Sequence, residues 1–279
     1  MSNQEIKITA KHNLFDLKLK ETLQYKDLIK LHVKKNFAII YKQTIFGPLW
    51  LIVNPLLSSL VYTFVFGNMI GLSTGGMPYL LFYMSGTAMW ALFTNCLSGT
   101  SSTFLANASI FGKVYFPRLT IPFSQGITAL IKFAIQFVML LVFYAFYCIN
   151  GFNLYIGTNL IFVPILIIQI TVLALSLGMI ISSLTVKYRD LSMAMGLFTQ
   201  LLMYVTPILY ALDGIDQRLV KFILLNPLTP IIHNFRASLF GAGNFMIGSW
   251  IYSLVFTIFL FFVVIILYNK AERDFIDVI

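Results

Sequence analysis

The chain has 279 residues and a formal net charge of +9, with 59% hydrophobic and only 10% charged residues. Soluble domains carry about 25% charged residues, so the composition excludes an ordinary water-soluble domain and predicts a membrane protein. Cys96 and Cys148 both fall inside apolar runs, where a small buried thiol is the ordinary interpretation and no disulfide framework is indicated.

Residues 1–46 are charged or mixed and lack a short apolar core with a small-residue cleavage site, so we expect a cytoplasmic segment without a removable signal peptide. Within it, residues 22–40 have the period of an amphipathic helix. Its polar half holds Lys26, Lys30 and Lys34, and its apolar half holds Phe37. A helix packed on a soluble partner has the same pattern, but the membrane span that follows favours a position at the membrane interface.

The rest of the chain, 47–279, is expected to form one transmembrane domain. A bilayer crossing needs about 20 apolar residues, and backbone groups in hydrocarbon must be paired within a helix. We therefore predict an all-α integral membrane protein with six transmembrane helices. The predicted spans are about 48–70, 78–100, 121–149, 160–185, 191–211 and 247–268.

Span one carries a polar and aromatic stripe, because Trp50, Asn54, Ser58 and Tyr62 recur every four residues. Side chains at this spacing share one face of a helix. Aromatic residues in membrane proteins often face lipid or other helices. Flat aromatic faces also bind sugar rings through their negative π cloud. We favour a pore for this stripe.

The loop of residues 101–120 is too apolar for a free linker. Its apolar side chains are Phe104, Ile110, Phe111, Val114, Tyr115 and Phe116. An exposed patch of this kind marks an interaction site, so we expect a partner to dock here. The alternative is that the loop packs against its own chain or the lipid headgroups.

The only ionisable side chain deep in a predicted span is Lys132, with Gln136 one turn later and Gln169 as a possible partner in span four. Its cost in hydrocarbon implies that it faces protein or water, unless it reaches toward the inner headgroups. All ten Asp and Glu residues lie outside the spans, which disfavours coupling to protons or sodium through a buried acid.

Before the last span, residues 212–246 combine an apolar stretch, two prolines and a Gly-Ala-Gly turn. This pattern predicts short re-entrant helices at the outer face, which membranes tolerate where protein covers the broken backbone. Fifteen of the nineteen Lys and Arg residues fall on the side of the N-terminal segment. The positive-inside rule therefore predicts that both termini lie on the cytoplasmic side and that the protein resides in the cytoplasmic membrane. The positive charges do not form the basic stripe that is typical of a nucleic-acid-binding surface.

Catalytic signatures are missing from the sequence. The three histidines, His12, His32 and His233, are far apart, and no phosphate-binding glycine loop precedes a Lys-Ser or Lys-Thr pair. We expect no enzyme activity, cofactor or metal on this chain.

An ordered set of short motifs resembles the permease subunits of ATP-binding-cassette exporters for polysaccharides such as O-antigen, capsule and teichoic acid. The resemblance covers nearly the whole chain. Its motifs are Tyr41-Lys42-Gln43-Thr44, Phe46-Gly47-Pro48-Leu49-Trp50, Pro55-Leu56, Phe64-Val65-Phe66-Gly67, Phe116-Pro117-Arg118, Tyr188-Arg189-Asp190, Thr206-Pro207-Ile208-Leu209-Tyr210, Asn226-Pro227-Leu228-Thr229-Pro230 and Phe235-Arg236.

The resemblance implies a homodimer with two separate ATPase subunits that hold ATP and Mg, moving a lipid-linked polysaccharide outward. Its implied coupling residues are Ile110, Phe111, Lys113, Tyr115, Phe116, Pro117, Arg118, Tyr188, Arg189 and Asp190. Spans one and five would line the channel with Trp50, Asn54, Ser58, Tyr62, Gln200 and Tyr204. The interfacial helix would act as a gate, and Asn226, Pro227 and Arg236 would form the outer gate. Lys132 departs from the resemblance, which implies a neutral or acidic residue at this position of span three.

Two other functions fit part of the pattern. An exporter half for a drug, a lipid or haem would share the six spans, but not the Phe-Pro-Arg and Tyr-Arg-Asp motifs. A membrane enzyme acting on lipid-linked sugars would need clustered carboxylates or histidines at a membrane face, and Asp213 with Asp216 is the only acidic pair near one.

Overall fold

The structure is a computed structural model that describes residues 19–42, 47–107, 116–153, 155, 157–185, 187–188 and 190–278. Every regular element in these ranges is helical, and none of the described residues forms a strand. The predicted all-α fold class is confirmed. This follows from the composition, since long apolar runs in hydrocarbon satisfy their backbone groups only within helices.

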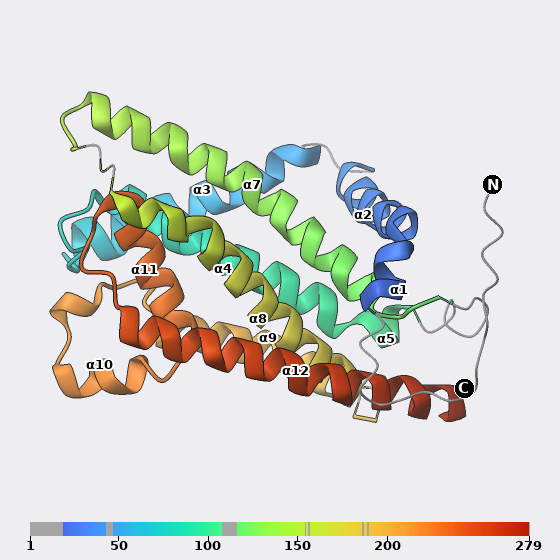
Figure 1. Ribbon diagram of the computed structural model, residues 1–279. Helices are drawn as coiled ribbons and strands as arrows, with labels where there is room; N and C mark the ends of the chain where they lie inside the picture. Colours follow the sequence, from blue (N-terminus) through green and yellow to red (C-terminus); the bar gives the residue numbers. More distant parts are fainter. Residues whose placement is uncertain are drawn as a thin grey trace.

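Five helical segments are long and apolar enough to cross a membrane, and they lie side by side in Figure 1. The first is continuous from η1 (Gly47–Leu49) through α3 (Trp50–Tyr62) to the π-helical η2 (Thr63–Met69). The others are α4 (Tyr79–Ser101), α7 (Thr120–Ile149), η3 (Thr158–Ile161) with α8 (Phe162–Thr185), and α12 (Ile247–Val278). They match five of the six predicted spans.

The fifth predicted span, 191–211, differs from the structure. Helix α9 runs over Leu191–Val205, and its fifteen residues rise roughly 22 Å, less than the ~30 Å hydrocarbon core. It ends because Thr206 is extended, with φ −97° and ψ 139°, as the residue before a proline prefers. The described residues therefore confirm five long spans and not the count of six.

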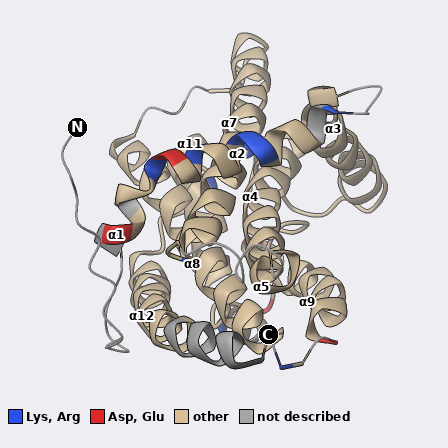
Figure 2. Cartoon of the chain, turned by 90° about the vertical axis from the view of Figure 1, so that its right-hand side faces the viewer, with Lys and Arg blue, Asp and Glu red and all other residues tan. Residues whose placement is uncertain are grey.

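Helix α4 is the centre of the bundle: in Figure 2 it lies between α3, α7, α8 and α9. It packs most extensively on α8 and α7, and Leu92, Phe93 and Leu97 on α4 are completely buried. Figure 2 also shows charged residues on α1 and α2, whereas α4 and α8 are drawn in tan along their lengths. Apolar side chains thus hold these helices together, with few charges between them.

The crossing of α4 and α8 depends on Gly178. A Cβ there would lie 2.6 Å from Thr100 Cβ and 3.0 Å from the carbonyl oxygen of Leu97. We expect Gly178→Val to lower the stability of the purified protein by about 1–3 kcal/mol through overpacking, seen as a lower thermal midpoint in detergent. Gly196→Val on α9, where a Cβ meets nothing within 4 Å, is the control. Equal midpoints for the two variants would contradict the close crossing.

The amphipathic segment forms two helices, α1 (Leu19–Gln24) and α2 (Lys26–Tyr41). Lys26, Lys30 and Lys34 are exposed and Phe37 is half-buried, as the pattern predicts. Asn36 Nδ2 donates to Thr128 Oγ1 of α7 over 3.2 Å. Helix α2 therefore packs on its own chain, and a soluble partner is not needed to explain its apolar half.

The opposite end of the bundle carries η4 (Leu212–Gly214), α10 (Gln217–Ile223) and α11 (Leu228–Phe240). The short helix α5 (Thr103–Ala106) and the C-terminal end of α12 lie at the same end as α1 and α2 in Figure 1. Helix α11 ends at Gly241, whose φ of 68° is left-handed, a conformation that glycine adopts without steric cost.

Candidate functional site

Four predicted channel residues line one cavity of about 310 Å³ beside α3: Trp50, Asn54, Ser58 and Tyr62. Their spacing of four places them on the same face of the helix. That face turns toward α4, which packs on α3. The structure therefore brings together the whole stripe that the sequence singles out.

The opposite wall of this cavity comes from α4, which the sequence analysis did not single out. Its lining residues are Thr87, Trp90, Ala91, Thr94 and Asn95, and Gln136 of α7 and Met203 of α9 complete the lining. Thr87, Ala91 and Thr94 or Asn95 are one turn apart, but the many other Ser, Thr and Gly residues of span two conceal this wall in the sequence. Indole rings and hydroxyl or amide groups alternate around the cavity, a composition suited to a polyhydroxylated ligand. We call this cavity the α3–α4 groove.

Gln200 and Tyr204 do not line the α3–α4 groove, although they lie one turn apart on the neighbouring helix α9. Both are exposed, and the carbonyl of Tyr204 accepts a hydrogen bond from the Tyr210 hydroxyl at 3.2 Å. Tyr204 also interacts electrostatically with Tyr62. The structure thus brings Tyr204 to one end of the groove and leaves Gln200 on an open face of α9.

Helices α3 and α9 expose large apolar faces. Only 6% of the residues in the most apolar stretch of the first span are buried, against 72% for α4, and α9 has no buried residue. The exposed side chains include Leu57, Leu60 and Val61 on α3, Phe64 on the adjoining η2, and Leu197, Phe198, Leu201 and Val205 on α9. This surface is apolar enough to meet lipid or another protein.

Arg236 of α11 is buried at the other end of the bundle, with 4% of its surface exposed. Its Nη1 donates to the Pro207 carbonyl at 2.6 Å, and its Nη2 donates to the carbonyls of Ile208 at 3.0 Å and Phe82 at 3.1 Å. Its Nε donates to Ser85 Oγ at 3.2 Å, and the guanidinium lies 3.6 Å from the centre of the Phe82 ring. One side chain thus joins α11, α4 and the segment after α9. We call these contacts the Arg236 clamp.

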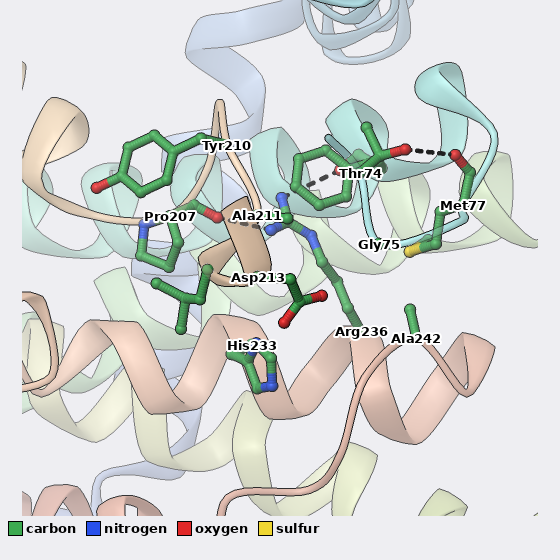
Figure 3. A pocket seen from close by; sticks show the side chains of 12 residues that line it. Thr74, Gly75, Met77, Pro207, Tyr210, Ala211, Asp213, His233, Arg236 and Ala242 are labelled. Atoms are coloured by element: carbon green, nitrogen blue, oxygen red, sulfur yellow. Dashed lines mark hydrogen bonds between the residues drawn. The ribbon is translucent and has the colours of Figure 1, made fainter. Parts of the chain in front are cut away.

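The clamp holds a charge without a carboxylate partner among the described residues. Burial lowers the pKa of Arg236 to about 9, which leaves the guanidinium charged at neutral pH. Carbonyl oxygens therefore offset the loss of water around it. Figure 3 shows Arg236 reaching toward Pro207, with Asp213 and His233 beside the same small pocket. Gly86 leaves room for the guanidinium, because a Cβ there would overlap Nη2.

Asn226 and Pro227 fix the start of α11. Asn226 Nδ2 donates to Thr206 Oγ1 at 2.9 Å, and its Oδ1 accepts from the backbone N–H of Leu228 at 3.1 Å. The Pro227 carbonyl accepts from Ser253 Oγ of α12 at 2.6 Å. The three predicted outer-gate residues therefore lie in one region and tie its elements to each other.

The described flanks of the predicted coupling loop are buried in their own chain. Phe116 is 6% and Arg118 7% exposed, Pro117 is buried, and Phe104 is fully buried with its ring 4.9 Å from that of Tyr268. For Phe104 and Phe116 the expectation of an exposed patch is wrong, and the alternative of packing against the chain itself is correct. Ile110, Phe111, Lys113, Val114 and Tyr115 lie outside the described residues.

The second predicted coupling motif lies at the turn before α9. Tyr188 and Asp190 are exposed, and Arg189 lies outside the described residues. Lys187 sits over the Tyr188 ring, with Nζ 5.4 Å from its centre. Tyr188 and Asp190 are accessible at this turn.

Gln169 is not a partner of Lys132, contrary to the sequence-based suggestion. Gln169 Oε1 accepts from the indole of Trp250 at 2.9 Å and its Nε2 donates to Ser253 at 3.0 Å. It is therefore engaged in joining α8 to α12. Lys132 is half-buried on α7.

Long apolar helices that enclose an aromatic and polar groove define a multi-pass membrane protein of the transport class. The sequence model of the "ABC-2 type transporter" family matches residues 27–240, and the chain belongs to this family. It is thus a transport subunit and not an enzyme.

Three relatives are similar over most of the chain. An O-antigen export system permease protein RfbA of Klebsiella pneumoniae is 30% identical over 265 residues, which cover 94% of this chain and 99% of the relative. A second protein of that name from the same species is 29% identical over the same shares. One from Myxococcus xanthus is 24% identical over 221 residues, 78% of this chain and 82% of the relative.

Proposed function

We propose that this chain is the transmembrane subunit of an ATP-driven exporter that moves lipid-linked O-antigen across the cytoplasmic membrane. The three relatives indicate the substrate class, since all of them are O-antigen export permeases. The observation that carries the proposal is the α3–α4 groove. Its indole, phenol, hydroxyl and amide groups suit sugar rings, whereas a groove for an apolar drug or lipid would gain nothing from the amides.

We further propose that two copies assemble around the groove. The apolar faces of α3 and α9 lie on either side of it and would be covered by the second copy. A homodimer would then close two facing grooves into one channel, with Gln200 and Tyr204 along its axis. Symmetric dimers are the commonest oligomers. Polar groove walls would face the pathway, and the lipid-facing sides of α7 and α12 would remain apolar.

Energy is proposed to come from two separate ATPase subunits, which would hold ATP and Mg. They would dock on the cytoplasmic end, at Ile110, Phe111, Lys113 and Tyr115, and at Tyr188, Arg189 and Asp190, whereas Phe116, Pro117 and Arg118 are buried and would hold this loop to its own chain. The exposed Tyr188 and Asp190 support contact at that end. The positive-inside rule places this end in the cytoplasm.

In this arrangement α9 and the segment after it make the fifth of six crossings, and α10 and α11 are re-entrant from the outer face. Residues 212–246, held by the Arg236 clamp, would form the outer gate. At the cytoplasmic end, the lysine-bearing face of α2 would lie among anionic headgroups, where the lipid-linked substrate arrives. Lys26, Lys30, Lys34 and Phe37 would place this helix as the interfacial gate.

Reconstituted vesicles test the proposal. The chain and its ATPase are inserted into lipid vesicles that carry fluorescent lipid-linked O-polysaccharide, and transfer of the polysaccharide across the bilayer is followed with ATP. We expect transfer with both proteins and ATP, and none when the ATPase is omitted. Transfer by the chain alone, or none with the complete system, would contradict the proposed function.

A further inference from the structure

The polar groups that line the α3–α4 groove are of two kinds. Those on α4 are satisfied by their own helix: Thr94 Oγ1 donates to the Trp90 carbonyl at 3.0 Å, and Asn95 Nδ2 donates to the Ala91 carbonyl at 2.6 Å. These bonds fix the orientation of the two side chains, and each side-chain oxygen keeps the capacity to accept a further hydrogen bond.

Gln136 is different. Its side chain comes from α7, is 5% exposed, and lines the groove. Its Oε1 is covered by protein atoms and has no hydrogen-bond partner among the described residues, so the amide has to turn toward the groove before this oxygen meets a ligand. A buried amide oxygen without a partner lowers stability, and native proteins keep few of them. Replacement by an apolar residue of similar size removes that cost, so stability alone does not favour glutamine at this position.

Two further polar side chains with open capacity line the same groove as Gln136. Asn54 and Ser58 of α3 are exposed to it, one turn apart, and neither has a hydrogen bond within the described part of the chain. The indoles of Trp50 and Trp90 stand on the two walls. A ligand between them meets flat rings at the sides and amide and hydroxyl groups at its edges.

We propose that Gln136 is a specificity-determining residue of the α3–α4 groove, whose amide turns toward the groove and forms a hydrogen bond with a hydroxyl of the transported sugar chain. The inference rests on the proposed function and deepens it, because it assigns one polar contact to a residue of α7, outside the helices expected to line the channel. Asn54 and Ser58 contact the same sugar unit from the other wall. In this role Gln136 selects the ligand and lowers the stability of the protein.

Tryptophan fluorescence gives a readout that does not depend on transport. The chain has three tryptophans, and two of them, Trp50 and Trp90, line the groove. In a Trp250→Phe background the tryptophan signal of this chain comes from the groove alone, and the signal of the ATPase by itself is subtracted. The purified complex is titrated with the surface polysaccharide of the producing cells, released from its lipid by mild acid.

We expect Gln136→Met to weaken the fluorescence-detected binding about tenfold, the loss that follows from removing one hydrogen bond in a dry site. Its thermal midpoint should be equal to or above that of the parent. Val138→Met, on the exposed side of the same helix at 60% exposure, is the control and should leave both values unchanged.

The possible results separate the inference from the proposed function. If the parent responds to polysaccharide and Gln136→Met responds equally, Gln136 does not contact sugar and the inference alone is overturned. If Gln136→Met loses binding together with a lower midpoint, the residue is structural and the inference is also overturned. If the parent itself does not respond, the proposed function fails and the inference fails with it.

Discussion

Replacing Arg236 by methionine should lower the free energy of unfolding by about 2–6 kcal/mol, because two buried carbonyls lose their donor at about 1–3 kcal/mol each, and abolish export. Methionine keeps the apolar stem of the side chain, ends short of the guanidinium nitrogens and removes all four donated hydrogen bonds. The carbonyls of Pro207 and Ile208 would remain buried without their donor, whereas the Phe82 carbonyl would still accept from Ser85 Oγ. Helix α11 would then lose its attachment to α4.

The experiment compares thermal midpoints of the purified proteins and the amount of polysaccharide at the cell surface. Arg218→Met is the control, because Arg218 is exposed on α10 and engages Asp216 only through its backbone N–H. Changes at such exposed sites stay within about 0.5 kcal/mol. A wild-type midpoint for Arg236→Met would show that the clamp does not hold the outer region.

Helix positions follow from the sequence where composition and breakers agree. The third predicted span, 121–149, corresponds to α7 at Thr120–Ile149, because Pro117 precedes it, Pro122 lies in its first turn, and Asn150 and Gly151 follow it. For α9 the two signals disagree. Ile208 and Leu209 are apolar and extend the hydropathy signal, but Pro207 ends the helix. Both residues are buried against protein, and hydropathy does not distinguish protein from lipid as the apolar surroundings.

One wall of the groove was predictable and the other was missed for a physical reason. On α3 most residues face outward, so Asn54 and Ser58 stand out against an apolar background. Helix α4 is the least apolar of the five spans, and its many Ser, Thr and Gly residues hide the stripe. The burial of Phe104 could not be predicted from the neighbouring sequence either, because Tyr268, whose ring packs against it, is brought near only by folding.

The clamp and the groove meet on α4, which relates the outer region to the pathway. Phe82 carries the Arg236 contact, and the adjacent Tyr83 ring lies 6.2 Å from that of Tyr62, a groove residue. Thr87, one turn further along α4, faces Ser59 at 3.0 Å. A shift of α11 would therefore be transmitted along about two turns of α4 to the end of the groove.

Replacing Ile110 and Phe111 together by aspartate should abolish association with the ATPase and stop export while leaving membrane insertion unchanged. Two carboxylates in an apolar contact lose their water without gaining partners, so we expect the ATPase that co-purifies to fall at least about tenfold, equivalent to ~1.4 kcal/mol of binding. Insertion is preserved because both positions lie between spans, and Phe104 and Phe116 anchor the chain on each side.

Two comparisons make this result specific. Ser102→Asp adds a carboxylate at an exposed position in the same connection and should leave co-purification at the level of the unchanged protein. Arg118→Glu is a poorer test, because Arg118 is only 7% exposed and a reversed buried charge lowers stability by itself. Wild-type recovery of the ATPase with the double aspartate variant would place the docking surface elsewhere, leaving the exposed turn at Tyr188 and Asp190 as the next surface to alter.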